Sequence, residues 1–262
     1  MIPLHDDNPT TLTPVITIGL IVVCALVFLW QVTLPPGAGE AAVYAYGLIP
    51  AVLFGERTLP PEIARIPAEL SVLTSMFLHG GWLHLIGNML YLWIFGNNIE
   101  DAMGHARFVV FYVICGIAAA FAQALQDPGS TVPMIGASGA IGGVLGGYLL
   151  LYPRARVLVL VPFGFFMHMI RIPAVIVLGF WFVLQFLESA LAGDQAGGVA
   201  YWAHIGGFVA GMVLVIPLRK KSFPLFGGPR PAVVPPPPGR GGRSPWNQLP
   251  RSGRDRSRGP RH

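Results

Sequence analysis

One apolar segment of this chain reads Gly136-Ala137-Ser138-Gly139-Ala140-Ile141-Gly142-Gly143-Val144-Leu145-Gly146-Gly147. A later apolar segment reads Tyr201-Trp202-Ala203-His204-Ile205-Gly206-Gly207-Phe208-Val209-Ala210-Gly211. Glycine has nothing beyond Cα, so the glycines in both segments allow two helices to approach until their backbones nearly touch. We expect this crossing to bring the hydroxyl of Ser138 within hydrogen-bond reach of the imidazole of His204. A histidine is costly in hydrocarbon, which indicates a function or a polar partner for His204.

The composition is typical of a polytopic membrane protein. Hydrophobic residues make up 53% of the 262 residues, charged residues make up 11%, and the mean hydropathy is +0.62. These values argue against a soluble globule. Cys24 and Cys115 both lie in apolar runs, so we interpret them as small buried side chains and not as a metal site or a disulfide framework. The sequence contains no phosphate-binding loop and no paired metal-ligand spacing, and we expect no cofactor.

Six segments are candidates for membrane spans, at roughly residues 13–34, 83–95, 107–125, 138–152, 172–191 and 200–218. The second and fourth are short of the roughly 20 residues that a full crossing needs. We expect the second to extend back toward Ser75 or to begin below the membrane surface, which predicts a recessed site. The predicted fold is therefore an all-α bundle of six transmembrane helices over residues 13–220. A short N-terminal segment, residues 1–12, precedes it, and a tail, residues 221–262, follows it.

The basic residues predict the orientation of the chain. If both termini are cytoplasmic, the inner side receives all eleven Lys and Arg that follow the last span, together with Arg107, Arg154, Arg156 and Arg171. The outer loops then hold only Arg57 and Arg65, which is the asymmetry expected of membrane proteins. No convincing cleavage site follows the first apolar run, so we interpret that run as a retained span. This orientation puts Ser138 and His204 at similar depths near the outer side.

A second polar cluster lies in the stretch His79-Gly80-Gly81-Trp82-Leu83-His84-Leu85-Ile86-Gly87-Asn88-Met89-Leu90-Tyr91. His84 and Asn88 are four residues apart, so on a helix they share one face. Amide hydrolysis develops negative charge on the former carbonyl oxygen, and each preset donor typically contributes roughly 10²- to 10³-fold in rate. We expect His84, Asn88 and the backbone N–H of Ser138 to be such donors, which makes a hydrolase plausible.

Taken together, these motifs resemble the rhomboid intramembrane serine proteases. The similarity rests on the His84 and Asn88 spacing, on Gly136-Ala137-Ser138-Gly139, and on Ala203-His204 with glycines at 207 and 211. The stretch Glu100-Asp101-Ala102-Met103-Gly104-His105-Ala106-Arg107-Phe108 is similar to a further element of that family. The resemblance covers the chain from about the first span to Leu218, and the motifs occur in the family's order.

The resemblance implies a mechanism and an architecture. Ser138 would be the nucleophile, His204 the general base and later the acid, and His84 and Asn88 would stabilise the oxyanion, with no aspartate in the dyad. The substrates would be transmembrane segments of other membrane proteins, cleaved through an acyl-enzyme in a bacterial-type plasma membrane. Residues 35–69 would form a large outer loop lying partly in the interface. The fifth span, rich in aromatic residues, and residues 192–199 would form a lateral gate and cap.

The sequence departs from the family in one respect. Some members carry an aromatic residue four positions after the serine, where it stacks on the catalytic histidine, but this chain has Gly142. Support for His204 must then come from elsewhere, and Trp202 and an aromatic residue of the fifth span are both candidates. Glu188 and Asp194 lie near the outer end of the fifth span, and neither is an evident acidic partner that would extend the dyad to a triad.

Each element also has an alternative explanation. Ser138 alone is equally well explained as a helix N-cap. Asn88 alone could form a hydrogen bond between helices, and His204 alone could belong to the proton relay or substrate site of a transporter. Two rival functions stay open: a rhomboid-like pseudoprotease that escorts membrane helices, and a small-solute transporter, although no internal repeat is clear. We treat His79, His105 and His168 as ordinary solvated or interfacial residues.

The tail beyond about Lys220 has a different composition. It contains Pro235-Pro236-Pro237-Pro238, scattered glycines and eight arginines, which predicts a disordered segment. Its charge fits either a solvated tail that fixes orientation or attachment to anionic inner-leaflet lipid. No aromatic or groove-reading motif supports binding to nucleic acid. The sequence gives no indication of the oligomeric state.

Overall fold

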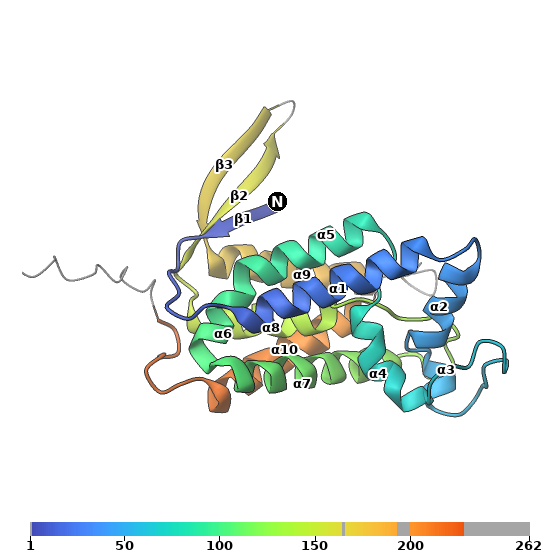
Figure 1. The fold of residues 1–262 in the computed structure, drawn as a ribbon. Helices are drawn as coiled ribbons and strands as arrows, with labels where there is room; N and C mark the ends of the chain where they lie inside the picture. The colour runs from blue at the N-terminus through green and yellow to red at the C-terminus, as the bar shows by residue number, and fades with distance from the viewer. Residues whose placement is uncertain (1, 164–165, 193–199, 228–262) are drawn as a thin grey trace, which may run out of the picture. The chain divides into compact units, whose positions relative to one another are not determined.

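The computed structural model describes residues 2–163, 166–192 and 200–227, which belong to one compact unit (Figure 1). The strands are β1 (Ile2–Asp6), β2 (Arg156–Phe163) and β3 (Phe166–Pro173). The helices are α1 (Val15–Thr33), α2 (Ala38–Tyr46), α3 (Pro50–Leu53), α4 (Ser71–Thr74), α5 (Trp82–Tyr91), α6 (Asn97–Met103), α7 (His105–Ala124), α8 (Ser138–Leu151), α9 (Ala174–Ala192) and α10 (Tyr201–Leu218). The tail predicted to be disordered begins with residues 221–227, which instead pack on the helices, with Phe223 in the core; residues 228–262 lie outside the described residues.

Three helices are long and apolar enough to cross a membrane: α1, α7 and α10. A fourth candidate is the bent pair Ala68–Phe77 and Trp82–Met103, whose two arms meet at 80°. The remaining two expected spans correspond to shorter apolar helices, Ser138–Leu151 and Ala174–Leu184. The part of the chain that the structure describes therefore contains three or four membrane-length spans, where the sequence predicts six.

The second expected span, 83–95, begins within one residue of its predicted start but ends later than predicted. It begins at Trp82, after a break that contains Gly80 and Gly81, and does not continue straight back toward Ser75. Glycine is a poor helix former, so the chain turns there by 80°. At the other end a π-helical segment, Leu92–Gly96, joins α5 to α6 and carries the helix on to Met103. The extension thus lies on the side opposite to the one predicted.

The all-α expectation is wrong at one end of the molecule, where three strands form an antiparallel sheet in the order β1-β2-β3. Val157, Val159 and Val161 alternate along β2, and this pattern of β-branched residues favours a strand with one buried face. These residues form a strand where the sequence predicts a connection between two spans. Residues 2–6, within the short segment expected ahead of the first span, form β1 and pair with β2.

A buried cluster of polar side chains holds the N-terminal segment to the helices. Glu100 has no exposed surface, and its carboxylate accepts hydrogen bonds from the backbone N–H groups of Ile16 (2.9 Å) and Thr17 (2.8 Å). Glu100 therefore caps α1, a helix that follows Pro14 and has no side-chain cap of its own. Nearby, Tyr148 donates to Asp6 at 2.7 Å, while burial raises the pKa of Asp6 above its usual value.

The centre of the core is the packing of α10 against α8 and α7. Several glycines lie between these helices because there is no room for a side chain. A Cβ built at Gly207 or Gly211 would overlap the backbone carbonyl of Gly139 or Gly143, respectively. The close crossing that the glycine pattern predicts is present, and it fixes the position of α10 against the first turns of α8.

Candidate active site

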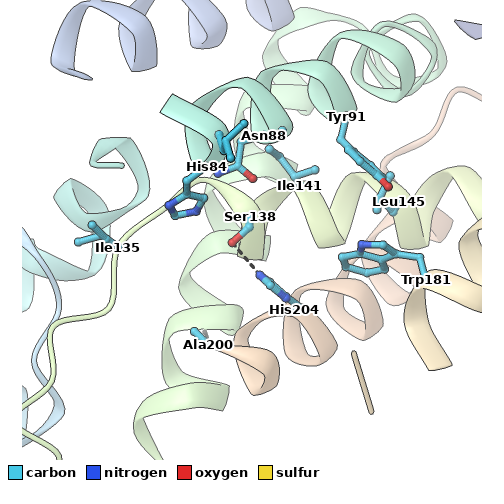
Figure 2. Close-up of a pocket in the computed structure, with 12 residues that line it drawn as sticks. His84, Asn88, Tyr91, Ile135, Ser138, Ile141, Leu145, Trp181, Ala200 and His204 are labelled. Carbon is cyan, nitrogen blue, oxygen red and sulfur yellow. Dashed lines mark hydrogen bonds between the residues drawn. The ribbon is translucent and has the colours of Figure 1, made fainter. Parts of the chain in front are cut away.

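Ser138 and His204 face each other across the contact between α8 and α10. The hydroxyl oxygen Oγ of Ser138 lies 2.8 Å from Nε2 of His204 (Figure 2). The N-cap of α8 is Ala137, and no side chain caps the helix, so Ser138 does not act as an N-cap. As the first residue of α8, Ser138 also has a backbone N–H that lacks an acceptor within the helix.

The same helix crossing explains why position 142 holds glycine and not an aromatic residue. A Cβ at this position would lie 2.9 Å from the carbonyl oxygen of His204 and 3.4 Å from the backbone nitrogen of Phe208. These atoms belong to backbone and cannot move aside as a flexible side chain does. An aromatic side chain at position 142 is therefore incompatible with this approach of α8 to α10.

An aromatic ring from another helix lies against His204 instead. The ring centroids of Trp181, on α9, and His204 are 5.8 Å apart, with 41° between the ring planes. Trp181 also lies 6.2 Å from the ring of Phe208, one turn further along α10. Of the two candidates raised by the sequence, the structure thus gives this contact to an aromatic residue of the fifth expected span.

His84 and Asn88 lie on α5, with their side chains directed toward Ser138 (Figure 2). The backbone N–H of Gly80 donates to Nδ1 of His84 at 3.3 Å. An acceptor nitrogen carries no proton, so the neutral ring bears its proton on Nε2 and can donate from there. Among the described residues, the buried amide nitrogen of Asn88 has no hydrogen-bond partner, which leaves it as an unused donor.

Gly136 makes the approach of His84 to Ser138 possible. Its φ is +125°, a backbone conformation that residues with a side chain rarely adopt. A Cβ at Gly136 would lie 2.8 Å from both Cε1 and Nε2 of His84 and 3.6 Å from Oγ of Ser138. Both the backbone conformation and the space therefore require glycine at this position.

One cavity of about 330 Å³ is lined by the side chains of His84, Asn88, Ser138 and His204. Its walls come from α5, α8, α9 and α10, and they also include Leu83, Tyr91, Leu145 and Trp181. None of the described residues that line it carries a carboxylate. Of the acidic residues weighed above, Asp194 lies outside the described residues, as does most of the predicted cap, residues 193–199.

The interpretation of His79 as a solvated residue is wrong. Only 2% of its surface is exposed, its backbone N–H donates to Gln31 at 3.0 Å, and its ring centroid lies 5.1 Å from that of His84. The sequence analysis also missed the contribution of Gly80. Both residues belong to the stretch that holds His84, but only the 80° break in the helix brings them beside its ring.

Comparison with known proteins gives one family. The family model described as the rhomboid domain matches residues 67–221. The chain is 34% identical over 146 residues to the rhomboid protease GluP of Bacillus subtilis, covering 56% of this chain and 26% of that protein. It is 31% identical over 158 residues to the mitochondrial rhomboid protein 1 of Saccharomyces cerevisiae, covering 56% and 41%. It is 29% identical over 164 residues to the chloroplastic rhomboid-like protein 11 of Arabidopsis thaliana, covering 59% and 54%. The chain thus spans between about a quarter and about half of the length of these relatives.

Proposed function

This chain belongs to the rhomboid family, and on that premise we propose that it is an intramembrane serine endopeptidase. The family match and the apolar helices make it a multi-pass integral membrane protein. The observation that carries the proposal is the distance of 2.8 Å between Oγ of Ser138 and Nε2 of His204, in the wall of a cavity among the helices.

In the proposed reaction, Oγ of Ser138 attacks the carbonyl carbon of the scissile peptide while Nε2 of His204 takes the hydroxyl proton. The resulting tetrahedral species collapses, the C–N bond breaks, and His204 returns the proton to the leaving amine. An ester between Ser138 and the N-terminal part of the substrate is left. Water, again deprotonated by His204, attacks this ester and releases the new carboxylate together with the free serine.

Three donors around Ser138 are assigned to the oxyanion. They are the Nε2–H of His84, the amide of Asn88 and the backbone N–H of Ser138. The hydrogen bond from Gly80 supports the donor role of His84, and the unpartnered amide nitrogen supports that of Asn88. Because donors fixed before the reaction need no reorganisation, each is expected to contribute roughly 10²- to 10³-fold.

Trp181 is assigned the role of positioning His204. Its ring takes the place of the aromatic residue that Gly142 excludes, and the distance of 5.8 Å between the ring centroids supports the assignment. Such a contact restricts the rotation of the imidazole, whose Nε2 has to stay aimed at Oγ of Ser138.

Substrate is proposed to enter sideways, between α5 and α9. These helices form facing walls of the cavity, and among the described residues they are not closely packed on each other. A substrate helix that unwinds beside this opening exposes a peptide bond to Ser138, and unwinding is easiest where the helix contains glycine or other poor helix formers. The cavity, whose mostly apolar lining includes the polar side chains of Ser138 and His204, also supplies a place for the hydrolytic water.

The six-span arrangement with both termini cytoplasmic is also part of the proposal. Because β1 pairs with β2, an even number of crossings must separate residue 6 from residue 156. Four crossings satisfy this condition: α1, the α5–α6 segment, α7 and α8. On the opposite side, the bridge between Leu48 and Met134 requires an even number between those residues, and two crossings separate them. We assign residues 13–220 to the membrane domain, in a bacterial-type plasma membrane, and residues 221–262 to a cytoplasmic tail.

The test is cleavage of a fluorescent transmembrane substrate by purified protein in liposomes, with Ser138→Ala and His204→Ala as controls. The proposal predicts cleavage by the wild type and none by either variant. Cleavage that persists in both variants would exclude the dyad. Binding of the helix without cleavage in the wild type would favour a pseudoprotease that escorts membrane helices. Transport of a small solute with neither binding nor cleavage would favour the transporter.

A further inference from the structure

The β2–β3 hairpin exposes apolar side chains that the active site does not use. The exposed fractions on β3 are 73% for Phe166, 65% for Met167, 66% for Met169 and 45% for Ile170. Several large apolar side chains exposed along one strand are rare where a protein faces water, and they mark contact with another protein or with a membrane.

The position of the hairpin favours the membrane. Four residues separate the end of α8 from the start of β2, and α9 begins directly after β3, so the hairpin starts where two helices of the membrane domain end. Figure 1 shows it running across the direction of the helix axes, which is along the plane of a bilayer that the helices cross. A segment in this position lies beside lipid headgroups.

The register of the sheet shows which surface meets the bilayer. Val157 and Val159 of β2 are fully buried, and their partners across the ladder are Ile172 and Ile170. Side chains alternate along a strand, so Phe166 shares this face with Ile170. The face that packs on the helices at the base of the hairpin therefore continues outward as exposed surface, on which His168 lies between the apolar side chains of Ile170 and Phe166.

That surface is continuous with the lipid-facing surface of α9. The first turns of α9 expose Val175, Ile176 and Phe180, which contact acyl chains in a membrane-spanning helix. Around the base of the hairpin, Arg154, Arg156 and Arg171 are also exposed. Apolar side chains flanked by arginines are complementary to the boundary between acyl chains and anionic headgroups.

We propose that the β2–β3 hairpin is an interfacial anchor that lies in the leaflet on the side of the N-terminus. Both faces of the exposed part of β3, residues 166–170, contact lipid, and Arg154, Arg156 and Arg171 contact anionic headgroups. This role rests on the membrane location of the chain and not on its catalytic activity.

Fluorescence quenching from the two sides of the interface tests the anchor. Phe166→Cys and Met169→Cys place a bimane label on opposite faces of the hairpin. Val213→Cys on α10, whose native side chain is 61% exposed, is the lipid control, and Glu62→Cys in the exposed outer loop is the water control. Cys24 and Cys115 are fully buried, and unmutated protein gives the background labelling. The vesicles contain equal parts of phosphatidylcholine and phosphatidylglycerol.

We expect both hairpin labels to be quenched by nitroxide on lipid acyl chains at least half as strongly as the label at position 213. Aqueous iodide should quench them several-fold less than the label at position 62. Iodide quenching equal to that at position 62, at either hairpin position, would overturn the anchor. A label shielded from both quenchers would also overturn it, because another protein surface would then cover the hairpin.

The role of the arginines has its own test. In the wild-type background we expect nitroxide quenching at position 169 to fall at least twofold when phosphatidylcholine replaces all the anionic lipid. In the triple variant Arg154→Gln, Arg156→Gln and Arg171→Gln, we expect this dependence on anionic lipid to disappear. Equal quenching in both lipids in the wild-type background would exclude the electrostatic part of the proposal. Unchanged thermal unfolding confirms that the labelled variants fold.

Discussion

Among the proposed site residues, Trp181 is the one whose role is inferred most from the structure and least from the sequence. Its ring lies beside His204 because α9 packs on α10, and no spacing in the sequence indicates that contact. Trp181, 23 positions before His204 in the chain, thus makes the ring contact with His204 that a side chain at position 142 cannot make. The backbone of α10 occupies the space next to Gly142.

Replacing Trp181 tests its positioning role. An aromatic contact contributes roughly 0.5–1.5 kcal/mol beyond burial, so we expect Trp181→Ala to lower kcat about two- to tenfold. Trp181→Phe should restore most of the loss, because it keeps a ring. Phe121→Ala, at an exposed position on α7 and away from the proposed substrate entry, is the matched control and should leave kcat unchanged. If the variants at 121 and 181 behave alike, or if phenylalanine rescues nothing, Trp181 does not position His204.

We predict that replacing Asn88 lowers activity without lowering stability. Loss of an oxyanion donor should lower kcat by roughly 10²- to 10³-fold in Asn88→Leu, with little change in KM. The amide nitrogen is buried without a partner among the described residues, so an apolar isostere should leave stability unchanged or raise it by about 1 kcal/mol. Steady-state kinetics and thermal unfolding in detergent measure both effects. A marked loss of stability would instead assign Asn88 to interhelical packing.

The sequence predicts which polar side chains meet better than it predicts the residues that support them. The cost of a histidine in hydrocarbon singles out His204, the surrounding glycines indicate its contact with Ser138, and the four-residue spacing indicates His84 and Asn88. The structure places all four side chains beside one cavity. Support for these residues arises from backbone geometry and from distant helices, as with the amide of Gly80 and the ring of Trp181. Neither leaves a local pattern in the sequence.

At the scale of elements, the crossing of α8 and α10 is set by glycines that no larger residue can replace. A methyl group at Gly211 would overlap the backbone carbonyl of Gly143, so the two helices would have to separate. Because Ser138 and His204 lie on these two helices, any separation also lengthens the contact between Oγ and Nε2.

Gly211→Ala tests this coupling of packing to the site. Overpacking typically costs about 1–3 kcal/mol, so we expect a lower melting temperature together with a loss of cleavage activity. Gly19→Ala, on α1, has no atom within 4 Å of the new methyl group, and the higher helix propensity of alanine should leave stability unchanged or slightly raised. Equal melting temperatures for the two variants would contradict the close crossing.

Helices were easier to predict than strands for a physical reason. A long apolar run identifies a helix that crosses a membrane, and α1, α7 and α10 lie close to their expected positions. The strands β2 and β3 carry many of the same apolar residues, and the pairing of β2 with β1 joins segments about 150 residues apart. Contacts over such separations are not visible in a local pattern.

At the scale of the whole molecule, the orientation has a direct test. With both termini cytoplasmic, a cysteine at Glu62 should react with an impermeant maleimide added to intact cells. A cysteine at Lys221, beyond the last span, should react only after the membrane is opened. The pairing of β1 with β2 keeps residues 6 and 156 on one side of the membrane, and the distribution of basic residues predicts that this side is the cytoplasm. Labelling of position 221 in intact cells, or protection of position 62, would contradict it.

The central claim is that Ser138 is a nucleophile activated by His204, and active-site labelling tests it most directly. Protein in liposomes is treated with a fluorophosphonate probe, and the modified residue is located by mass spectrometry. The account predicts a single adduct on Ser138 and its loss in both Ser138→Ala and His204→Ala, each of which should still unfold as a cooperative unit. An adduct on another residue, or undiminished labelling of Ser138 in His204→Ala, would contradict it.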